Sequence, residues 1–369
     1  MIWLWWIACG GPLLGKGAFT ISVSADEDVG NIPFTTSFHA DSDEDASFEW
    51  TFPSGSATGA DVDWTFLASG EAEVNVLAIS GDTTATATLT VIVESAKCPT
   101  TGLQKATGEV TTTTLNEISG VAKSRVDSDR LYVIEDANNA PDVVAISTSG
   151  EVTGTFSLPW ATARDWEDIA VSRSNSDGVS RIYVADIGDN DPLDRSEVRV
   201  AVIEEPAMNA NSDEVDGFEM VLTYPDAPHD AETLMVDPVN DDLYILTKDS
   251  SGPATLWRKP APHTEGSDLL EEVLTLDFSQ EPLSGGATTG GDISPLGDRI
   301  VVRTYSSTAW LWRRDQAQPF DAAFDSKPCE IDLPSELQGE SIAFDDQNDW
   351  LWTVSELDTP DVNRTKLDN

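Results

Sequence analysis

The sequence predicts an all-β protein, in which a small immunoglobulin-like β-sandwich is followed by a β-propeller. Short segments that alternate apolar and polar residues recur along the chain, and turn-forming glycine, asparagine and aspartate residues separate them. Beyond the first third, a β-rich unit repeats. Its second strands begin at residues 131, 182, 243, 300 and 351, a spacing of about 51 to 61 residues that is typical of propeller blades.

The composition describes a globular and strongly acidic protein. The chain has 369 residues, of which 40% are hydrophobic and 24% charged, enough for two or three domains with buried cores. Its formal net charge is -45. Such a surface repels nucleic acids and anionic lipids and attracts cations, so we expect no nucleic-acid partner. Solubility or adaptation to salty surroundings explains the charge equally well.

Residues 1–17 form a separate segment with the character of an export signal. An apolar run, Ile2–Ala8, contains three tryptophans and is followed by Cys9-Gly10. This resembles the end of a bacterial lipoprotein signal, in which the cysteine is lipidated. The run is too short to span a bilayer and lacks a basic region before it. We expect an exported monomer, anchored by Cys9 at the cell surface or in the periplasm, and otherwise secreted; a frayed terminus without function is the alternative.

Residues 18–95 are expected to form the sandwich. Alternation is strongest at Thr84–Val93, and Trp50 lies in an alternating segment where it would anchor the core. Ser54-Gly55, Ser69-Gly70 and Ser80-Gly81-Asp82 supply turns. The further strands are expected at Phe19–Val23, Thr35–Phe38, Ser47–Phe52 and Glu73–Leu77.

This region resembles a polycystic-kidney-disease-type (PKD) domain. The matching residues are Phe48–Phe52, Ser69–Val76 and Thr88–Val93. Where that family has a Gly-Asp-Gly turn after the tryptophan strand, this chain has Pro53-Ser54-Gly55. The resemblance implies a spacer or adhesion module without catalysis.

Residues 102–369 are expected to form the propeller, with five units of four strands. The second strands are Leu131–Glu135, Ile182–Ala185, Leu243–Thr247, Ile300–Arg303 and Leu351–Val354. The first strands, which would line the central channel, are expected at Ile118–Ala122, Trp166–Ala170, Ala231–Met235, Gly291–Ser294 and Gly339–Ala343.

The ring is expected to close through the N-terminal strand of the propeller. After Leu351–Val354 only one more strand fits, around Val362–Lys366, while Gly108–Thr113 has no unit of its own. Pairing the two would remove two free sheet edges. The count is therefore five blades; six is the alternative if the connection Glu204–Gly217 hides strands. Cys98 and Cys329 flank this closure, and an exported protein would let them form a disulfide.

Carboxylates near the starts of the first strands form the candidate site. Glu167, Glu232 and Glu340 align at one position, with Asp292 one residue off and Glu117 just upstream in the first unit. Converging carboxylates repel one another unless a cation or proton neutralises them, and oxygen ligands favour calcium. The candidate calcium ligands are Glu167, Asp186, Asp189, Asn190, Glu232 and Glu340.

Other polar residues are expected around the same channel mouth. They comprise an acid/base cluster, five acidic residues in or near the strands, and two cations that would hold an anion: Glu117, Asp136, Asp165, His229, Asp230, Lys248, Asp292, Arg303 and Glu356. The alternative is structural. Each glutamate would then bind a neighbouring blade's backbone, Arg303 or Lys248, and only staple the ring together.

The propeller region resembles a group of exported bacterial propeller proteins without a settled function. The resemblance rests on Glu117–Gly120, Asp165–Ala170, Asp186–Asn190, His229–Glu232, Arg303–Tyr305 and Gln338–Ala343. More distantly, it is similar to phytase-like and lactonase-like propellers, whose channel-mouth carboxylates hold calcium. The resemblance implies calcium-assisted binding of a surface or small-molecule ligand; a metal-dependent hydrolase of phosphoesters or lactones is the alternative.

Overall fold

The computed structural model describes residues 19–112, 115, 117–136, 139–190, 193–249, 252–279, 286–356 and 359–368. Cys9 and the rest of the segment 1–17 lie outside these ranges. The chain divides into two compact units. The first contains the residues up to Lys97 together with Asp315–Pro319, and the second contains Cys98–Arg314 and Phe320–Asn369.

The first unit is a two-sheet β-sandwich. Its core includes Phe38, Trp50 and Val74, which come from both sheets and are buried. Trp50 is fully buried and donates its indole N–H to the Gly59 carbonyl at 2.9 Å, which confirms its role as a core anchor. One sheet has the order β1 (Ile21–Ala25), β3 (Phe34–Ser42) and β6 (Asp61–Phe66). The other has the order β2 (Val29–Asn31), β8 (Thr83–Glu94), β7 (Gly70–Ser80), β4 (Ser47–Phe52) and β5 (Gly55–Thr58).

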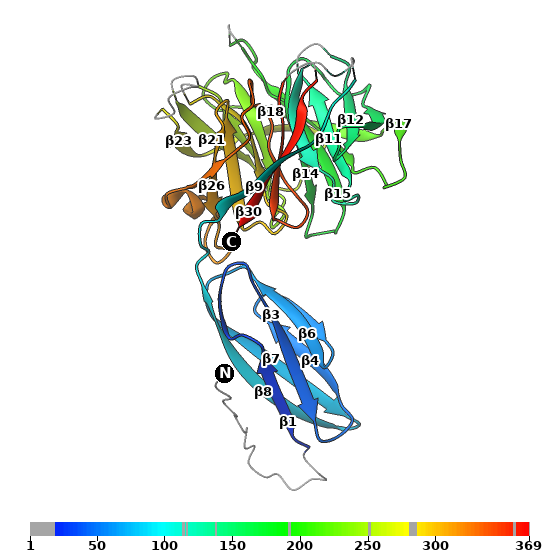
Figure 1. Ribbon diagram of the computed structural model, residues 1–369, viewed down its shortest axis with the longest axis vertical. Helices are drawn as coiled ribbons and strands as arrows, with labels where there is room; N and C mark the ends of the chain where they lie inside the picture. Colours follow the sequence, from blue (N-terminus) through cyan, green and yellow to red (C-terminus); the bar gives the residue numbers. More distant parts are fainter. Residues whose placement is uncertain are drawn as a thin grey trace. The chain divides into compact units, whose positions relative to one another are not determined.

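The second unit is a β-propeller with five blades of four antiparallel strands in its described residues (Figure 1). Blade 1 consists of β10 (Ile118–Lys123), β11 (Arg130–Glu135), β12 (Asp142–Ser147) and β13 (Val152–Ser157). Blade 2 consists of β14 (Trp166–Arg173), β15 (Ser180–Asp186), β16 (Val198–Glu204) and β18 (Gly217–Thr223). Blade 3 consists of β19 (Ala231–Val236), β20 (Leu243–Thr247), β21 (Pro253–Lys259) and β23 (Glu271–Asp277).

The last two blades complete the ring. Blade 4 consists of β24 (Thr288–Ile293), β25 (Arg299–Thr304), β26 (Thr308–Arg313) and β27 (Cys329–Asp332), with the 3-10 helix η1 (Phe320–Asp325) between its last two strands. Blade 5 consists of β28 (Ala343–Phe344), β29 (Trp350–Val354), β30 (Asp361–Asp368) and β9 (Thr100–Glu109). The first strands β10, β14, β19, β24 and β28 contact one another in a closed cycle.

Closure by the N-terminal strand is confirmed, but the predicted residues were wrong. β9 runs antiparallel to β30 from Thr100 to Glu109, so only Gly108 and Glu109 of the predicted stretch belong to it. The six-blade alternative is also wrong for the part of the chain described. The connection between β16 and β18 hides one short strand, β17 (Ser212–Glu214), which joins the edge of blade 1 instead of forming a new blade.

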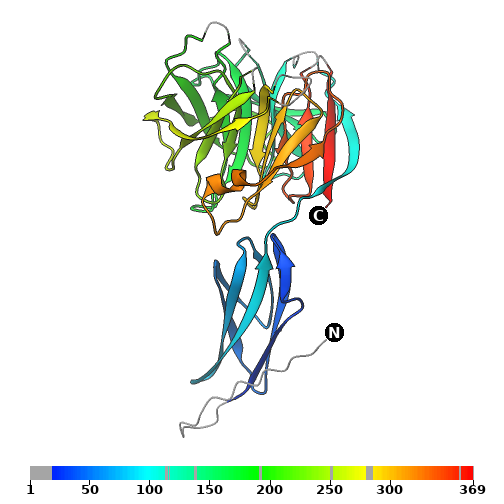
Figure 2. The ribbon, with the colours of Figure 1, turned by 90° about the vertical axis from the view of Figure 1, so that its left-hand side faces the viewer.

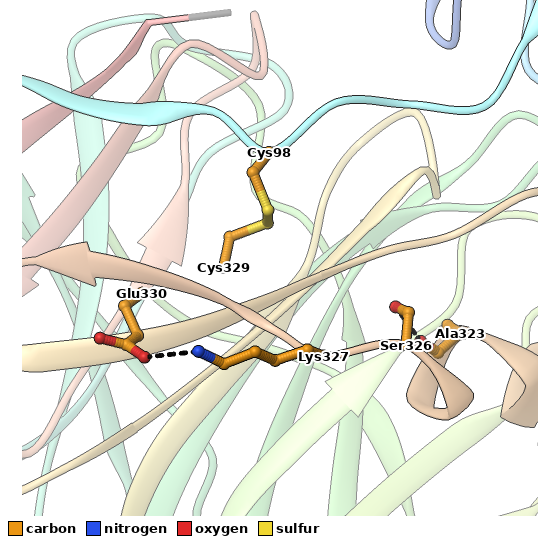
Figure 3. The surroundings of a disulfide bond; sticks show 6 residues. All are labelled: Cys98, Ala323, Ser326, Lys327, Cys329 and Glu330. Carbon is orange, nitrogen blue, oxygen red and sulfur yellow. Dashed lines mark hydrogen bonds and ion pairs between the residues drawn. A yellow bond between two sulfur atoms is a disulfide. The ribbon is translucent and has the colours of Figure 1, made fainter.

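The predicted disulfide is confirmed. Cys98 and Cys329 are bonded, with a Cα–Cα distance of 5.6 Å (Figure 3). The bond links residues 231 positions apart and ties the segment before β9 to the outer strand of blade 4. No helix within the described ranges has the length and apolar character needed to cross a membrane.

Candidate functional site

A β-bulge at the start of the first strand positions two of the predicted carboxylates. The strand register shifts between Trp166 and Asp168 in blade 2 and between Ala231 and Thr233 in blade 3. Glu167 and Glu232 are therefore the extra residues of equivalent bulges, a feature that re-aims a side chain away from the regular ladder.

The equivalent positions of blades 1 and 4 hold hydroxyl groups. Ser119 donates its hydroxyl to the Trp166 carbonyl at 2.9 Å, and Thr289 donates to the Gly339 carbonyl at 2.8 Å. Ser119 thus binds the first strand of blade 2, and Thr289 binds the segment that precedes the first strand of blade 5. A hydroxyl at the bulge position can therefore join two neighbouring blades by a hydrogen bond. Glu167 and Glu232 occupy this same position in blades 2 and 3.

Three carboxylates meet at the bulge of blade 2. Asp136 follows β11, Asp165 precedes β14, and Glu167 lies in β14; one oxygen of each lies within 4.8 Å of the others. We call these three residues the carboxylate triad. Glu167 is 6% exposed, and the other two are half-buried. Gly188 packs directly against the triad, since a Cβ there would overlap with the carboxylates of Asp165 and Glu167.

The triad is electrostatically unfavourable for three negative charges. Burial, followed by the charge of Asp136, raises the pKa of Asp165 to about 6. The pKa of Glu167 lies well above its usual value because of burial and, next, the charges of Glu232 and Asp136. Among the described residues, no group donates a hydrogen bond to the side-chain carboxylate of Asp165 or of Glu167. A cation or a proton would relieve the repulsion.

A lysine and a tyrosine lie beside the glutamate of blade 3. Lys248 forms an ion pair with Oε1 of Glu232 and donates to the Tyr305 hydroxyl at 2.9 Å. Oε2 of Glu232 is buried and has no hydrogen-bond partner among the residues that the structure describes. Burial raises the pKa of Glu232 to about 7, although the attraction of Lys248 opposes this shift. Glu232 therefore has an oxygen available to a further ligand.

The carboxylate of blade 5 shares its surroundings with a second acid. Gln338 donates to Oε1 of Glu340 at 3.1 Å and also to Glu356. Burial, then the charge of Glu232, then a hydrogen bond with Glu356 raise the pKa of Glu340 to about 9. Glu340 does not belong to the three-carboxylate cluster found among the described residues, so it is a weaker candidate for binding a cation than the triad.

The structure places the predicted turn residues Asp186 and Asp189 in a different role. Asp186 forms an ion pair with Arg195 at 2.9 Å, and both side chains are buried. Asp189 accepts hydrogen bonds from the backbone N–H groups of Asp194 and Arg195. Asn190 is exposed. The turn is therefore held by its own loop, and its carboxylate oxygens are engaged by this loop.

Two further predicted residues are buried in structural contacts. Arg303 is fully buried and pairs with Glu336 at 2.8 Å, so its guanidinium is not presented to an anion. Asp292 accepts hydrogen bonds from the N–H groups of Ile293 and Phe344, both at 2.8 Å. Phe344 belongs to blade 5, so Asp292 binds the backbone of the neighbouring blade. This is the role that the structural alternative gave to the acidic residues of the first strands.

The remaining predicted residues lie around the triad without joining it. His229 bonds to Asp226 at 3.0 Å and packs edge-on against Tyr224. Asp230 accepts a hydrogen bond from the Asp189 N–H at 2.8 Å. Glu117 contributes its backbone carbonyl, which accepts the Asp136 N–H at 2.8 Å and so helps to place one member of the triad.

Sequence reasoning missed two residues that shape the site. Asp168 accepts hydrogen bonds from the N–H groups of Ile169 and Leu234, both at 2.8 Å, and so joins blades 2 and 3. We call Asp168 and Asp292 the staple carboxylates. The second residue is Gly188, whose role beside two carboxylates was signalled by its position in the acidic turn Asp186–Asn190.

Comparisons with known proteins add little to this description. No protein-family model and no curated protein matches the chain. Among solved structures, one similar chain is a quinoprotein alcohol dehydrogenase-like protein from Bacteroides thetaiotaomicron. The identity is 9% and the TM-score 0.32, over 93% of this chain and 96% of the other. At this TM-score, the similarity is not evidence for a shared site or activity.

Proposed function

We propose that this chain is an exported, cell-surface protein whose propeller binds a ligand at its acidic channel mouth with the assistance of calcium. The observation that carries the proposal is the carboxylate triad Asp136, Asp165 and Glu167, whose oxygens lie within 4.8 Å of one another. Hard oxygen donors with this much negative charge suit calcium, which takes six to eight oxygens and completes its shell with water or ligand oxygens.

The surroundings of the triad support a ligand next to the ion. Within the described part of the chain, Oε2 of Glu232 has no hydrogen-bond partner, and the ammonium group of Lys248 is held close by its partners Glu232 and Tyr305. A ligand with an anionic or hydroxyl group could meet both the cation of the triad and this lysine. The protein's net charge of -45 would concentrate cations at the mouth.

The proposal is tested by thermal unfolding of the full chain. Calcium that binds only the folded state stabilises it by about 2.7 kcal/mol at a hundredfold excess over Kd. Calcium should therefore raise Tm, whereas sodium at matched ionic strength should only screen the surface charge and raise it less. Glu167→Gln should shrink the calcium shift but not the sodium shift, and Glu151→Gln, at an exposed glutamate, is the matched control. Equal shifts from the two salts would contradict the proposal.

One observation favours hydrolysis as a second candidate function. Glu232, with a pKa raised to about 7, is poised near neutral pH beside the triad, as a general acid or base should be. A panel of phosphoesters and lactones, assayed with and without calcium, distinguishes the two functions. Turnover that requires calcium and is abolished by both Glu167→Gln and Glu232→Gln would replace the binding proposal.

A further inference from the structure

Two blades of the propeller are extended by a fifth strand that comes from the next blade. β17, in the connection between β16 and β18 of blade 2, pairs in parallel with β13 of blade 1. β22 (Gly266–Leu269), in the connection between β21 and β23 of blade 3, pairs in parallel with β18 of blade 2. We call β17 and β22 the capping strands. Each covers the outer backbone edge of the blade before it.

The two capping strands use the same geometry. The residue after each strand donates its backbone N–H to the last residue of the covered strand: Val215 to Ser157 at 3.0 Å, and Leu270 to Thr223 at 2.9 Å. Its side chain then enters the core between the two blades. Leu270 is 1% exposed, and Val215 packs against the core between blades 1 and 2. A capping strand thus combines backbone pairing with one aliphatic anchor.

Blade 3 has no such cover among the described strands. β23 pairs only with β21, and the corresponding connection of blade 4 forms the helix η1 instead of a strand (Figure 2). The residue equivalent to Ser157 and Thr223 is Asp277, which ends β23 and precedes the buried Phe278. Its carbonyl stands where those of the other two blades receive the anchor's N–H.

A groove lies at the place where the anchor would enter. It has a volume of about 460 Å³ and runs between the end of β23 and the third strand of blade 4. Its walls combine the apolar side chains of Leu276, Phe278, Trp310, Trp312 and Phe324 with polar ones, those of Asp277, Thr308, Ser326 and Glu330. The third strand of blade 2, β16, contributes Ala201 and Ile203 to the core that Val215 enters, so β26 occupies the equivalent place here.

The rim of the groove is acidic. Asp277 and Glu330 line it, and the exposed Glu272 lies on β23 itself. Lys327 neutralises Glu330 at 3.3 Å, as Figure 3 shows. The groove also belongs to a chain with a net charge of -45. Charge complementarity therefore favours a basic occupant.

We propose that this groove binds an extended, basic peptide segment of a partner protein. The peptide adds a parallel strand to β23, donates a backbone N–H to the Asp277 carbonyl, and packs one aliphatic side chain in the groove against Phe278 and Trp310, whose rings contact each other edge to face. This is strand addition, in which backbone hydrogen bonds provide affinity and a side-chain pocket provides specificity. The inference is independent of the calcium site, because the groove lies on the outer strands of blades 3 and 4.

The probe is a short peptide built on the protein's own capping strand. β22 and its anchor read Gly-Ser-Asp-Leu-Leu, so the labelled peptide Lys-Gly-Ser-Lys-Leu-Leu-Lys keeps the anchor and replaces the acid by lysine. Its binding to the full, disulfide-bonded chain is followed by fluorescence anisotropy. Replacing the second leucine by aspartate, or methylating its backbone nitrogen, should each weaken binding at least about tenfold, since they remove the anchor and the N–H donor.

Three protein variants complete the test. Trp310→Ala should weaken peptide binding about tenfold, and Asp277→Lys, at an exposed residue, about fivefold. Glu214→Lys, at an equally exposed acid on a capping strand, is the control and should leave the affinity unchanged. The proposal is overturned if the peptide does not saturate at about 1 mM, or if the aspartate peptide binds equally well. Two further results would overturn it. Displacement of the peptide by oligosaccharides would identify a carbohydrate as the occupant of the groove. Self-association of the chain that Trp310→Ala abolishes would identify a second copy as the occupant.

Discussion

Two sets of buried carboxylates on the first strands differ in what surrounds them. The staple carboxylates Asp168 and Asp292 each accept two backbone N–H groups, one from their own strand and one from the next blade. Glu167, directly before Asp168 in the sequence, is about as buried, but no hydrogen bond to its carboxylate is found among the described residues. Burial raises the pKa of both sets, so the pKa does not distinguish them. The number of donors does.

The largest effect is expected where a staple is removed. Asp168→Ala leaves the N–H groups of Ile169 and Leu234 buried without an acceptor, at about 1–3 kcal/mol each. We expect the free energy of unfolding to fall by about 3 kcal/mol in urea titration. Asp165→Ala, in the triad, is the matched comparison and should change it by less than about 1 kcal/mol without calcium. Equal losses would show that the triad is also a staple.

The second prediction concerns pH. The folded state holds a proton on Glu340 up to its pKa of about 9, whereas the unfolded chain releases it near 4.5. Between these values the folded state binds more protons, so stability falls as the pH rises. Glu232 and Asp165, with pKa values of about 7 and 6, act in the same direction over lower windows.

Without calcium, we expect Tm to fall by about 10 °C between pH 5 and pH 9, because the raised pKa of Glu340 corresponds to several kcal/mol and each kcal/mol shifts Tm by about 2–4 °C. Glu340→Gln should make this slope shallower, because the amide stays neutral throughout. Calcium should also flatten it by stabilising the charged triad. If the Glu340→Gln variant shows the same change of Tm with pH as the wild type, a group other than Glu340 binds the proton in the folded state.

The smallest effect is expected at Gly188. An alanine there would place its Cβ against the carboxylates of Asp165 and Glu167 and push the two apart. We expect calcium affinity, read from the Tm shift, to weaken about tenfold while stability falls by about 1 kcal/mol. Gly178→Ala, which meets no neighbouring atom but is strained by a φ of 74°, should lower stability without changing the calcium response. An unchanged calcium response would place the ion away from these carboxylates.

The sequence predicted those strands whose burial leaves a hydrophobic pattern. Leu243–Thr247 was predicted at its observed bounds because the whole strand is buried. β9 was misplaced because its residues are mostly exposed or half-buried and show no regular alternation. The capping strands β17 and β22 were missed for the same reason, since every residue in both is exposed. Their backbone pairing leaves no trace in side-chain chemistry.

For the candidate site, the sequence predicted which types of residue are present but not which partners each of them binds. An acidic residue at the start of a first strand is visible in the sequence, but its donors are not. Asp186 is engaged by Arg195, and Arg303 by Glu336, and these pairings depend on how loops return to the sheet. Asp136 and Asp165 come from neighbouring blades and meet only because blade 1 packs against blade 2.

The pairing of β9 with β30 has a consequence for biosynthesis. β9 is made first, but its partner Asp361–Asp368 is made about 250 residues later. At roughly 5–20 residues per second, the strand waits some 10 to 50 seconds with an unpaired edge. Such an edge can pair with the wrong chain during that time. Its exposed, polar character, with Gln104 and Lys105 at its centre, discourages such pairing, so the absence of a hydrophobic pattern protects the nascent protein.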